Sequence, residues 1–388
     1  MTRMLAGPIL LGVTMTAAAG AQDAGFAPSR RAGRFIYASG VRANDGAGAP
    51  AKGDIKAQTK RALENLEGRL EAAGSSLAMA AQVNVYLKNA ADFAAMNEVY
   101  RGFWSKDPPG RTTIVASSAD PAALIEIAAV AIPSGGERKV VHPSDWMTSP
   151  NPYSYAILSG DTLFLAGLVS RSGKDNHVVP GDVKTQTRTV LENGGEILKA
   201  AGMSHADVVQ SRVYITDTSL FQDMNATYRT FFPKDPPVRA TVKAGLMSPQ
   251  YQVEVTMVAV KGAREAITAP NADGSRGTPN PNLSSAVRVG ERLWVSGMLG
   301  NTDATKDDAD AQTRETLVRL GRTLKAAGFG WEHVRESVIY VSDLSHRAAV
   351  ERVWAERFPK DKPAGVLIEA PLMAPDGLVE IMLSASRE

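Results

Sequence analysis

A stretch of 18 residues occurs three times in this chain, and this repeat constrains the fold more than any other feature. The copies read AQTKRALENLEGRLEAAG from Ala57, TQTRTVLENGGEILKAAG from Thr185 and AQTRETLVRLGRTLKAAG from Ala311. Their spacing of 128 and then 126 residues is far longer than the period of about 20–50 residues found in solenoid repeats. Each copy therefore belongs to one whole small domain, and the chain carries three such domains.

The 388 residues divide accordingly. We expect repeat 1 at 24–132, repeat 2 at 151–261 and repeat 3 at 282–386. Domains of this size can bury a core of their own. The segments between them, 133–150 and 262–281, are rich in Pro, Gly and small polar residues, which is typical of linkers.

Every repeat shows the same pattern of elements. A strand (RFIYASG in repeat 1) precedes a long amphipathic helix, a β-branched run and a second helix, and two further strands close the unit. The apolar positions of the two helices in repeat 1 are Ala62, Leu63, Leu66 and Leu70, then Phe93, Met96, Tyr100 and Phe103. The order β-α-β-α-β-β predicts an α+β fold, in which a mixed sheet carries both helices on one face. The other sheet face is also apolar, and we expect a neighbouring repeat to cover it.

The N-terminus resembles an export signal. Arg3 precedes an uncharged, apolar or small stretch from Met4 to Ala19, and Ala19-Gly20-Ala21 offers a cleavage site. We predict a signal peptide at residues 1–21 and a periplasmic or secreted protein; the alternative is a short membrane anchor. The absence of cysteine fits export and excludes both disulfides and thiol nucleophiles.

Composition excludes several classes of function. The net charge of +2 comes with no basic block, which disfavours nucleic acid as a partner. No phosphate-binding loop, dinucleotide motif or metal-ligand spacing is present, so we expect neither a cofactor nor a metal. The five histidines are scattered and do not predict a triad; they are His142, His177, His205, His333 and His346.

One polar constellation recurs, an arginine followed by a glutamate 15 residues later. The pairs are Arg111 with Glu126 and Arg239 with Glu254, whereas the third copy has Gly365 with Glu380. A tight antiparallel hairpin centred near 118–119 would make Arg111 and Glu126 face one another. The pair is either a structural ion pair, or a carboxylate-binding arginine beside a carboxylate that activates water. Loss of the arginine in repeat 3 weighs against a purely structural pair.

The order and spacing of these motifs identify a family resemblance. The Ser-Gly strand end, the AQT helix, V-x-V-Y-L, F-x-x-M-N-x-x-Y, P-x-R-(S/T) and E-(I/V)-x-A-(I/V)-A together resemble the Rid family, also called YjgF-like or L-PSP endoribonuclease-like. The resemblance covers all three repeats. It implies a chorismate-mutase-like fold, a trimer with ligand pockets between subunits, and hydrolysis of enamines and imines to a 2-keto acid and ammonia.

The resemblance also implies roles for individual residues. The family arginine binds the substrate carboxylate and the family glutamate positions water, while a tyrosine, an asparagine and the Ser-Gly pair line the pocket. Repeat 1 keeps Ser39, Gly40, Asn97, Arg111 and Glu126, with Phe26 for the tyrosine; repeat 2 keeps Tyr153, Gly167, Asn225, Arg239 and Glu254, with Ala166 for the serine. Repeat 3 keeps Ser296, Gly297 and Glu380 but has Leu283, Glu351 and Gly365 for the tyrosine, asparagine and arginine.

The chain is thus expected to be a trimer fused into one polypeptide, monomeric, with at most two competent pockets and a degenerate third copy. The leading hypothesis is an exported enamine/imine deaminase acting on a small carboxylate, with no membrane contact after signal cleavage. The alternatives are a non-catalytic binding protein for small keto acids or other carboxylates, a deaminase specialised for one catabolic intermediate, and a ribonuclease. The sequence leaves open which neighbouring repeat contributes which residue to a pocket.

Overall fold

The computed structural model describes residues 25–44 and 52–388. The predicted signal peptide at 1–21 lies outside the described residues. Within the described part of the chain, no helix has the length and apolar character needed to cross a bilayer. The first repeat contains the strands β1 (Ser29–Ala32), β2 (Phe35–Val41), β3 (Ala80–Leu87), β4 (Gly110–Val115), β5 (Ser117–Ser118) and β6 (Ile125–Ala131), and the helices α1 (Ile55–Ala72) and α2 (Phe93–Phe103).

The other two repeats follow the same order. Repeat 2 comprises β8 (Ala156–Ser159), β9 (Thr162–Leu165), α3 (Val183–Ala200), β10 (Val208–Ile215), α4 (Phe221–Phe231), β11 (Val238–Lys243) and β12 (Val253–Val260). Repeat 3 comprises β14 (Ala286–Val289), β15 (Arg292–Leu299), α5 (Ala309–Ala326), β16 (Val334–Val341), α6 (Arg347–Arg357), β17 (Ala364–Glu369) and β18 (Val379–Ser386). The predicted α+β fold is confirmed, with one short strand added before the expected first strand. The linkers contribute β7 (Lys139–Val141) and β13 (Arg264–Ile267) to sheet edges.

The strand order corrects one expectation from the sequence. The first sheet runs β1-β2-β6-β3-β4, so β3 separates β4 from β6. Strand β4 pairs with β3 in parallel, while β6 pairs with β3 antiparallel. The predicted hairpin between the arginine and glutamate strands is therefore wrong. Because helix α2 connects β3 to β4, the chain makes a β-α-β crossover, which places the two strands side by side in parallel.

The long helix of each repeat begins and ends in the same way. Its N-cap aspartate (Asp54, Asp182 or Asp308) accepts a hydrogen bond from the backbone N–H three residues later. A glycine with positive φ follows each helix, as Gly74 does after α1 at φ 81°. The predicted apolar face of α1 packs into the core of repeat 1, where Leu63, Leu66 and Leu70 are fully buried.

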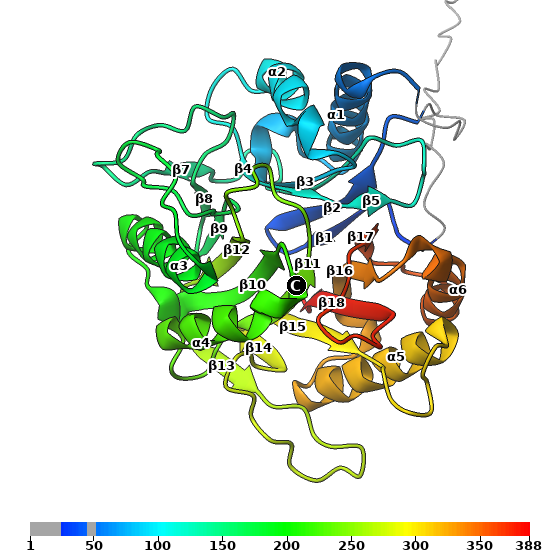
Figure 1. The fold of residues 1–388 in the computed structure, drawn as a ribbon. Coiled ribbons are helices and arrows are strands. Elements are labelled where there is room, and N and C mark those ends of the chain that lie inside the picture. Colours follow the sequence, from blue (N-terminus) through cyan, green and yellow to red (C-terminus); the bar gives the residue numbers. More distant parts are fainter. Residues whose placement is uncertain (1–24, 45–51) are drawn as a thin grey trace, which may run out of the picture.

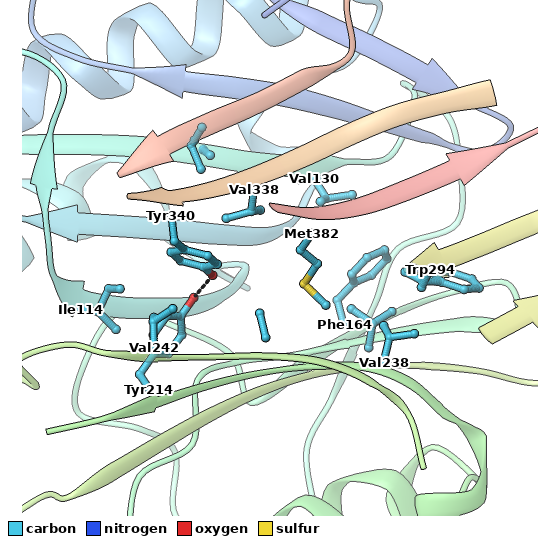
Figure 2. Close-up of a cluster of buried hydrophobic side chains, with 14 of the residues drawn as sticks. Ile114, Val130, Phe164, Tyr214, Val238, Val242, Trp294, Val338, Tyr340 and Met382 are labelled. Carbon is cyan, nitrogen blue, oxygen red and sulfur yellow. Dashed lines mark hydrogen bonds between the residues drawn. The ribbon is translucent and has the colours of Figure 1, made fainter. Parts of the chain in front are cut away.

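The three sheets surround a common centre and the helix pairs lie outside them (Figure 1). Side chains from all three sheets form one buried cluster at this centre, including Val130, Tyr214, Val238, Trp294 and Tyr340 (Figure 2). Each repeat thus covers the open sheet face of its neighbours, which makes the chain an intramolecular pseudo-trimer. The centre also contains an ion pair between the buried Arg212 and the partly buried Glu336, in which Arg212 Nη2 lies 3.3 Å from Glu336 Oε1.

Backbone hydrogen bonds join neighbouring repeats at their edge strands. The N–H of Val115 in repeat 1 donates to Gly245 O in repeat 2 at 2.8 Å, and the N–H of Lys243 in repeat 2 donates to Pro371 O in repeat 3 at 2.8 Å. At the third junction β17 pairs antiparallel with β5 of repeat 1. The ring of repeats is therefore closed by equivalent contacts at all three junctions.

Candidate active sites between repeats

The structure brings each arginine together with a glutamate of the next repeat. Arg111 of repeat 1 interacts electrostatically with Glu254 of repeat 2, and Arg239 of repeat 2 with Glu380 of repeat 3. The pairing of Arg111 with Glu126, expected from the sequence, does not occur because β4 and β6 are not neighbours. We call the first pair and its surroundings site A and the second site B; the equivalent junction of repeats 3 and 1 is junction C.

Site A is built around a buried arginine held by aromatic rings. Arg111 is 4% exposed, and its guanidinium carbon lies 4.7 Å from the ring centre of Tyr100 and 5.9 Å from that of Tyr153. Phe93 adds a third ring at 5.6 Å. Stacking of this kind holds the planar guanidinium while leaving its N–H groups free to bind a ligand. Nη1 of Arg111 has no hydrogen-bond partner among the described residues.

Several other buried polar atoms of site A also lack a partner within the described part of the chain. They are Asn97 Oδ1, Tyr100 OH and Thr113 Oγ1. Asn97 is held by a hydrogen bond from its Nδ2 to Asn151 Oδ1 at 3.4 Å. Unsatisfied buried polar groups are rare in native proteins because each costs about 1–3 kcal/mol. Their concentration beside Arg111 makes this position suited to a polar ligand.

The glutamate of site A is positioned by two residues of its own repeat. A Cβ on Gly167 would overlap the carboxylate of Glu254, so only glycine lets the carboxylate lie against the strand end. The buried Gln186 accepts a hydrogen bond from the backbone N–H of Gln252 at 2.8 Å, which fixes the start of the glutamate strand. Burial raises the pKa of Glu254 to about 8, although the N–H of Thr113 and the charge of Arg111 oppose the shift.

Site B repeats this arrangement one junction further. Arg239 is 2% exposed; its guanidinium carbon lies 4.7 Å from the ring of Tyr228, and its Nη2 donates to Asn225 Oδ1 at 2.6 Å. Its Nε and Nη1 have no partner among the described residues. Burial raises the pKa of Glu380 to about 8 against the influence of Arg239. A Cβ on Gly297 would overlap that carboxylate, and Ser296 Oγ accepts from the backbone N–H of Arg239 at 2.9 Å.

Junction C has lost the ligand-binding groups. Gly365 replaces the arginine, and the ring of Phe26 comes within 2.7 Å of the position that a Cβ of Gly365 would take. Trp354 stands where sites A and B have a tyrosine, 6.0 Å from the Phe26 ring. The remaining glutamate, Glu126, lies 3.5 Å from Arg42 of its own repeat. An aromatic contact and an internal ion pair thus take up the position of a ligand.

Each site therefore combines predicted residues from two neighbouring repeats, whereas the sequence grouped them within one repeat. Site A contains Asn97 and Arg111 from repeat 1 with Tyr153, Gly167 and Glu254 from repeat 2. Site B contains Asn225 and Arg239 from repeat 2 with Ser296, Gly297 and Glu380 from repeat 3. Ser39, Gly40 and Glu126, predicted as site residues, lie in junction C, where Ser39 Oγ accepts from the N–H of Gly365 at 2.9 Å.

Sequence reasoning missed the tyrosine beneath each guanidinium. Tyr100 and Tyr228 have the spacing of apolar core positions on the second helix of their repeats, so the helical pattern alone does not distinguish them from core residues. A signal was present: the tyrosine occurs in both repeats that keep the arginine, and it becomes Trp354 in the repeat that has Gly365. The five histidines lie outside both sites, and no cluster of three metal-ligating side chains occurs among the described residues.

The fold and the two sites define the class of protein. The chain belongs to the Endoribonuclease L-PSP family, whose model matches residues 16–133, 145–261 and 275–387. The family resemblance drawn from the sequence is confirmed.

Individual relatives match single repeats. A RutC family protein of Sulfurisphaera tokodaii is 40% identical over 111 residues, which are 29% of this chain and 89% of that protein. The 2-iminobutanoate/2-iminopropanoate deaminase of Rattus norvegicus is 32% identical over 125 residues, 32% of this chain and 91% of that protein. A chorismatase crystal structure is similar over 79% of this chain and 93% of its own, with a TM-score of 0.54 and 15% identity, and this likeness concerns the fold alone.

Proposed function

We propose that the protein is an imine deaminase that hydrolyses small 2-imino acids to 2-keto acids and ammonia in sites A and B. The observation that supports this most is the buried, partly unpaired guanidinium in each site, which faces a buried carboxyl from the next repeat. The deaminase names of relatives about as long as one repeat point in the same direction.

The chemistry follows from the two groups. Arg111 or Arg239 binds the substrate carboxylate through charge-assisted hydrogen bonds and thereby places the C2=N bond beside the glutamate. Water adds to C2 of the protonated imine while the carboxylate of Glu254 or Glu380 accepts one water proton, which gives a carbinolamine. The carboxyl passes that proton to the amine nitrogen and then accepts the proton of the carbinolamine hydroxyl as the C–N bond breaks, which leaves the keto acid and ammonia. A carboxyl with a pKa near the working pH suits both steps.

We propose that the protein acts outside the cytoplasm. We also propose that it is a monomer, because the fused repeats already supply three subunits. Mass measurement of the purified native protein tests the oligomeric state, and N-terminal sequencing of the exported protein tests cleavage after Ala21. A nuclease activity finds no support in these sites, because each offers one arginine and one carboxyl at a buried position rather than a basic groove.

The central test measures ammonia release from imines generated in situ by an amino-acid oxidase. Wild type should exceed the buffer rate, and the double variant Arg111→Met, Arg239→Met should return to it. Arg188→Met, an exposed arginine on α3, is the matched control and should behave as wild type. Ammonia release at the buffer rate by wild type would refute the proposal, and calorimetric binding of 2-oxobutanoate without turnover would instead indicate a binding protein for small carboxylates.

A further inference from the structure

The walls of sites A and B differ at positions that the fold makes equivalent. In site A the N–H of Ser154 donates to Pro109 O at 3.1 Å, and in site B the N–H of Ser284 donates to Pro237 O at 3.3 Å. These matched hydrogen bonds place the preceding residues, Tyr153 and Leu283, at the same point of their sites. A phenol in site A is thus replaced by an aliphatic side chain in site B.

A second exchange lies on the loop before each glutamate strand. The N–H of Tyr251 donates to Ser248 O at 3.2 Å, and the N–H of Gly377 donates to Ala374 O at 3.0 Å in the matching turn. Tyr251 interacts electrostatically with Tyr153 and Glu254, so the two phenols border the same site. Its hydroxyl accepts a hydrogen bond from Arg171 Nη1 at 2.8 Å, which fixes the ring.

Site B lacks this polar border. At Gly377 the side chain of Leu299 comes within 2.7 Å of the position that a Cβ would occupy. The residue equivalent to Arg171 is Asn301, whose amide donates to Asp376 Oδ1 at 2.9 Å. Two leucines therefore stand where site A has two tyrosines and a guanidinium.

We infer that the two sites select 2-imino acids with different side chains, and this inference rests on the proposed function. Site A, bordered by Tyr153 and Tyr251, takes short or polar side chains. Site B, bordered by Leu283 and Leu299, takes longer aliphatic or aromatic side chains. In both sites the arginine fixes the substrate carboxylate, so the rest of the substrate must lie toward these residues. In site A the ring centre of Tyr153 is only 5.9 Å from the guanidinium carbon.

The physical basis is the desolvation of the phenol groups. A bulky apolar side chain in site A would cover the tyrosine hydroxyls without offering them a hydrogen bond, which is unfavourable. Against the leucines of site B the same side chain gains burial with each methylene. Discrimination by one or two methylenes in such pockets is about tenfold or more.

The test uses two single-site enzymes, Arg239→Met with only site A intact and Arg111→Met with only site B intact. Calorimetry gives the dissociation constants of 2-oxobutanoate and 4-methyl-2-oxopentanoate, and kcat/KM is measured for the two corresponding imines. The preference for the longer compound should be at least about tenfold greater in the site B enzyme. Leu283→Tyr in that enzyme should reduce its preference, whereas the size-matched control Leu283→Met should keep it. Tyr153→Leu in the site A enzyme should raise its preference.

The outcomes separate this inference from the proposed function. Equal preferences in the two single-site enzymes, within about twofold, would overturn the inference while ammonia release still supported the deaminase. Unchanged preferences after both wall exchanges would also overturn it. Loss of ammonia release with retained, side-chain-dependent keto acid binding would remove the reaction but support the assignment of the two walls.

Discussion

The pairing of arginine and glutamate across repeats can be tested with double variants. Arg111→Met removes the carboxylate-binding group of site A while the thioether still packs on Tyr100. Hydrogen bonds to a charged group are worth about 1.5–3 kcal/mol, so site A should lose about 10- to 150-fold in kcat/KM. Loss of the proton-transferring glutamate should cost a site about 10²- to 10⁴-fold.

The diagnostic result is a difference between two double variants. Arg111→Met with Glu254→Gln damages site A twice, so its residual rate should equal that of Arg111→Met alone. Arg111→Met with Glu380→Gln damages both sites and should fall at least about tenfold below either single variant. The rates of Arg111→Met and Arg239→Met should sum to the wild-type rate.

The assay is ammonia release from the imine of 2-aminobutanoate at fixed protein concentration. Arg111→Met with Glu126→Gln is the control for a buried Glu→Gln exchange outside sites A and B, and it should retain the Arg111→Met rate because Glu126 lies in junction C. Pairing within one repeat predicts the reverse of the two diagnostic results, and the reasoning would be refuted if Arg111→Met with Glu254→Gln lost activity in both sites while Arg111→Met with Glu380→Gln kept the Arg111→Met rate.

Four further outcomes are expected. Because burial raises the pKa of Glu254 and Glu380 to about 8, log kcat/KM should rise with pH and level off near 8; a flat profile would contradict the base role. The folded state also retains a proton on each glutamate between the unfolded pKa of 4.5 and about 8, so stability falls as pH rises through that window, and the double Gln variant should gain Tm over wild type at pH 8.5. Gly365→Arg should lower Tm and leave calorimetric keto acid binding at two sites, because the β16 backbone and a phenylalanine ring occupy the space for its Cβ; a third binding event would contradict this. Arg212→Met should destabilise by about 3 kcal/mol, because the partly buried Glu336 would lose its cation and keep only the hydrogen bond from Ser384 within the described part of the chain, and adding Glu336→Gln should recover part of the loss in a urea titration.

Local sequence patterns predicted the helices and strands well, because these elements depend on the spacing and chemistry of residues that are close in sequence. The apolar spacing of Leu63, Leu66 and Leu70 identified the buried face of α1, and the position of Gly74 identified its end. The threefold repeat, together with the trimer that the family resemblance implies, then predicted the pseudo-trimer. The second residue of each repeated stretch is a glutamine to which the sequence pattern assigns no role. In the structure Gln58, Gln186 and Gln312 each tie the long helix to the backbone two residues before a glutamate.

The composition of the sites could not be predicted in the same way. Identical spacing within each repeat made Arg111 and Glu126 equally compatible with a hairpin and with separation by another strand. A repeated sequence also does not determine in which direction the repeats are arranged around the ring, and so which neighbour supplies the glutamate. The assignment of Arg111 to Glu254 rather than to Glu126 therefore required the sheet order, which is a long-range property.

Junction C also differs from the other two junctions in its covalent connection. Linkers 133–150 and 262–281 tether the repeats that form sites A and B, whereas repeats 3 and 1 meet without a tether. At this junction Trp354 donates to Gly25 O at 2.9 Å, Phe26 packs on Trp354, and Arg347 donates to Ala119 O at 2.8 Å. A pocket at junction C would have to open to admit a ligand, and this is the one junction that non-covalent contacts hold closed without a linker. The aromatic packing and hydrogen bonds at junction C therefore join repeat 1 to repeat 3 without a linker, at the position where sites A and B leave room for a ligand.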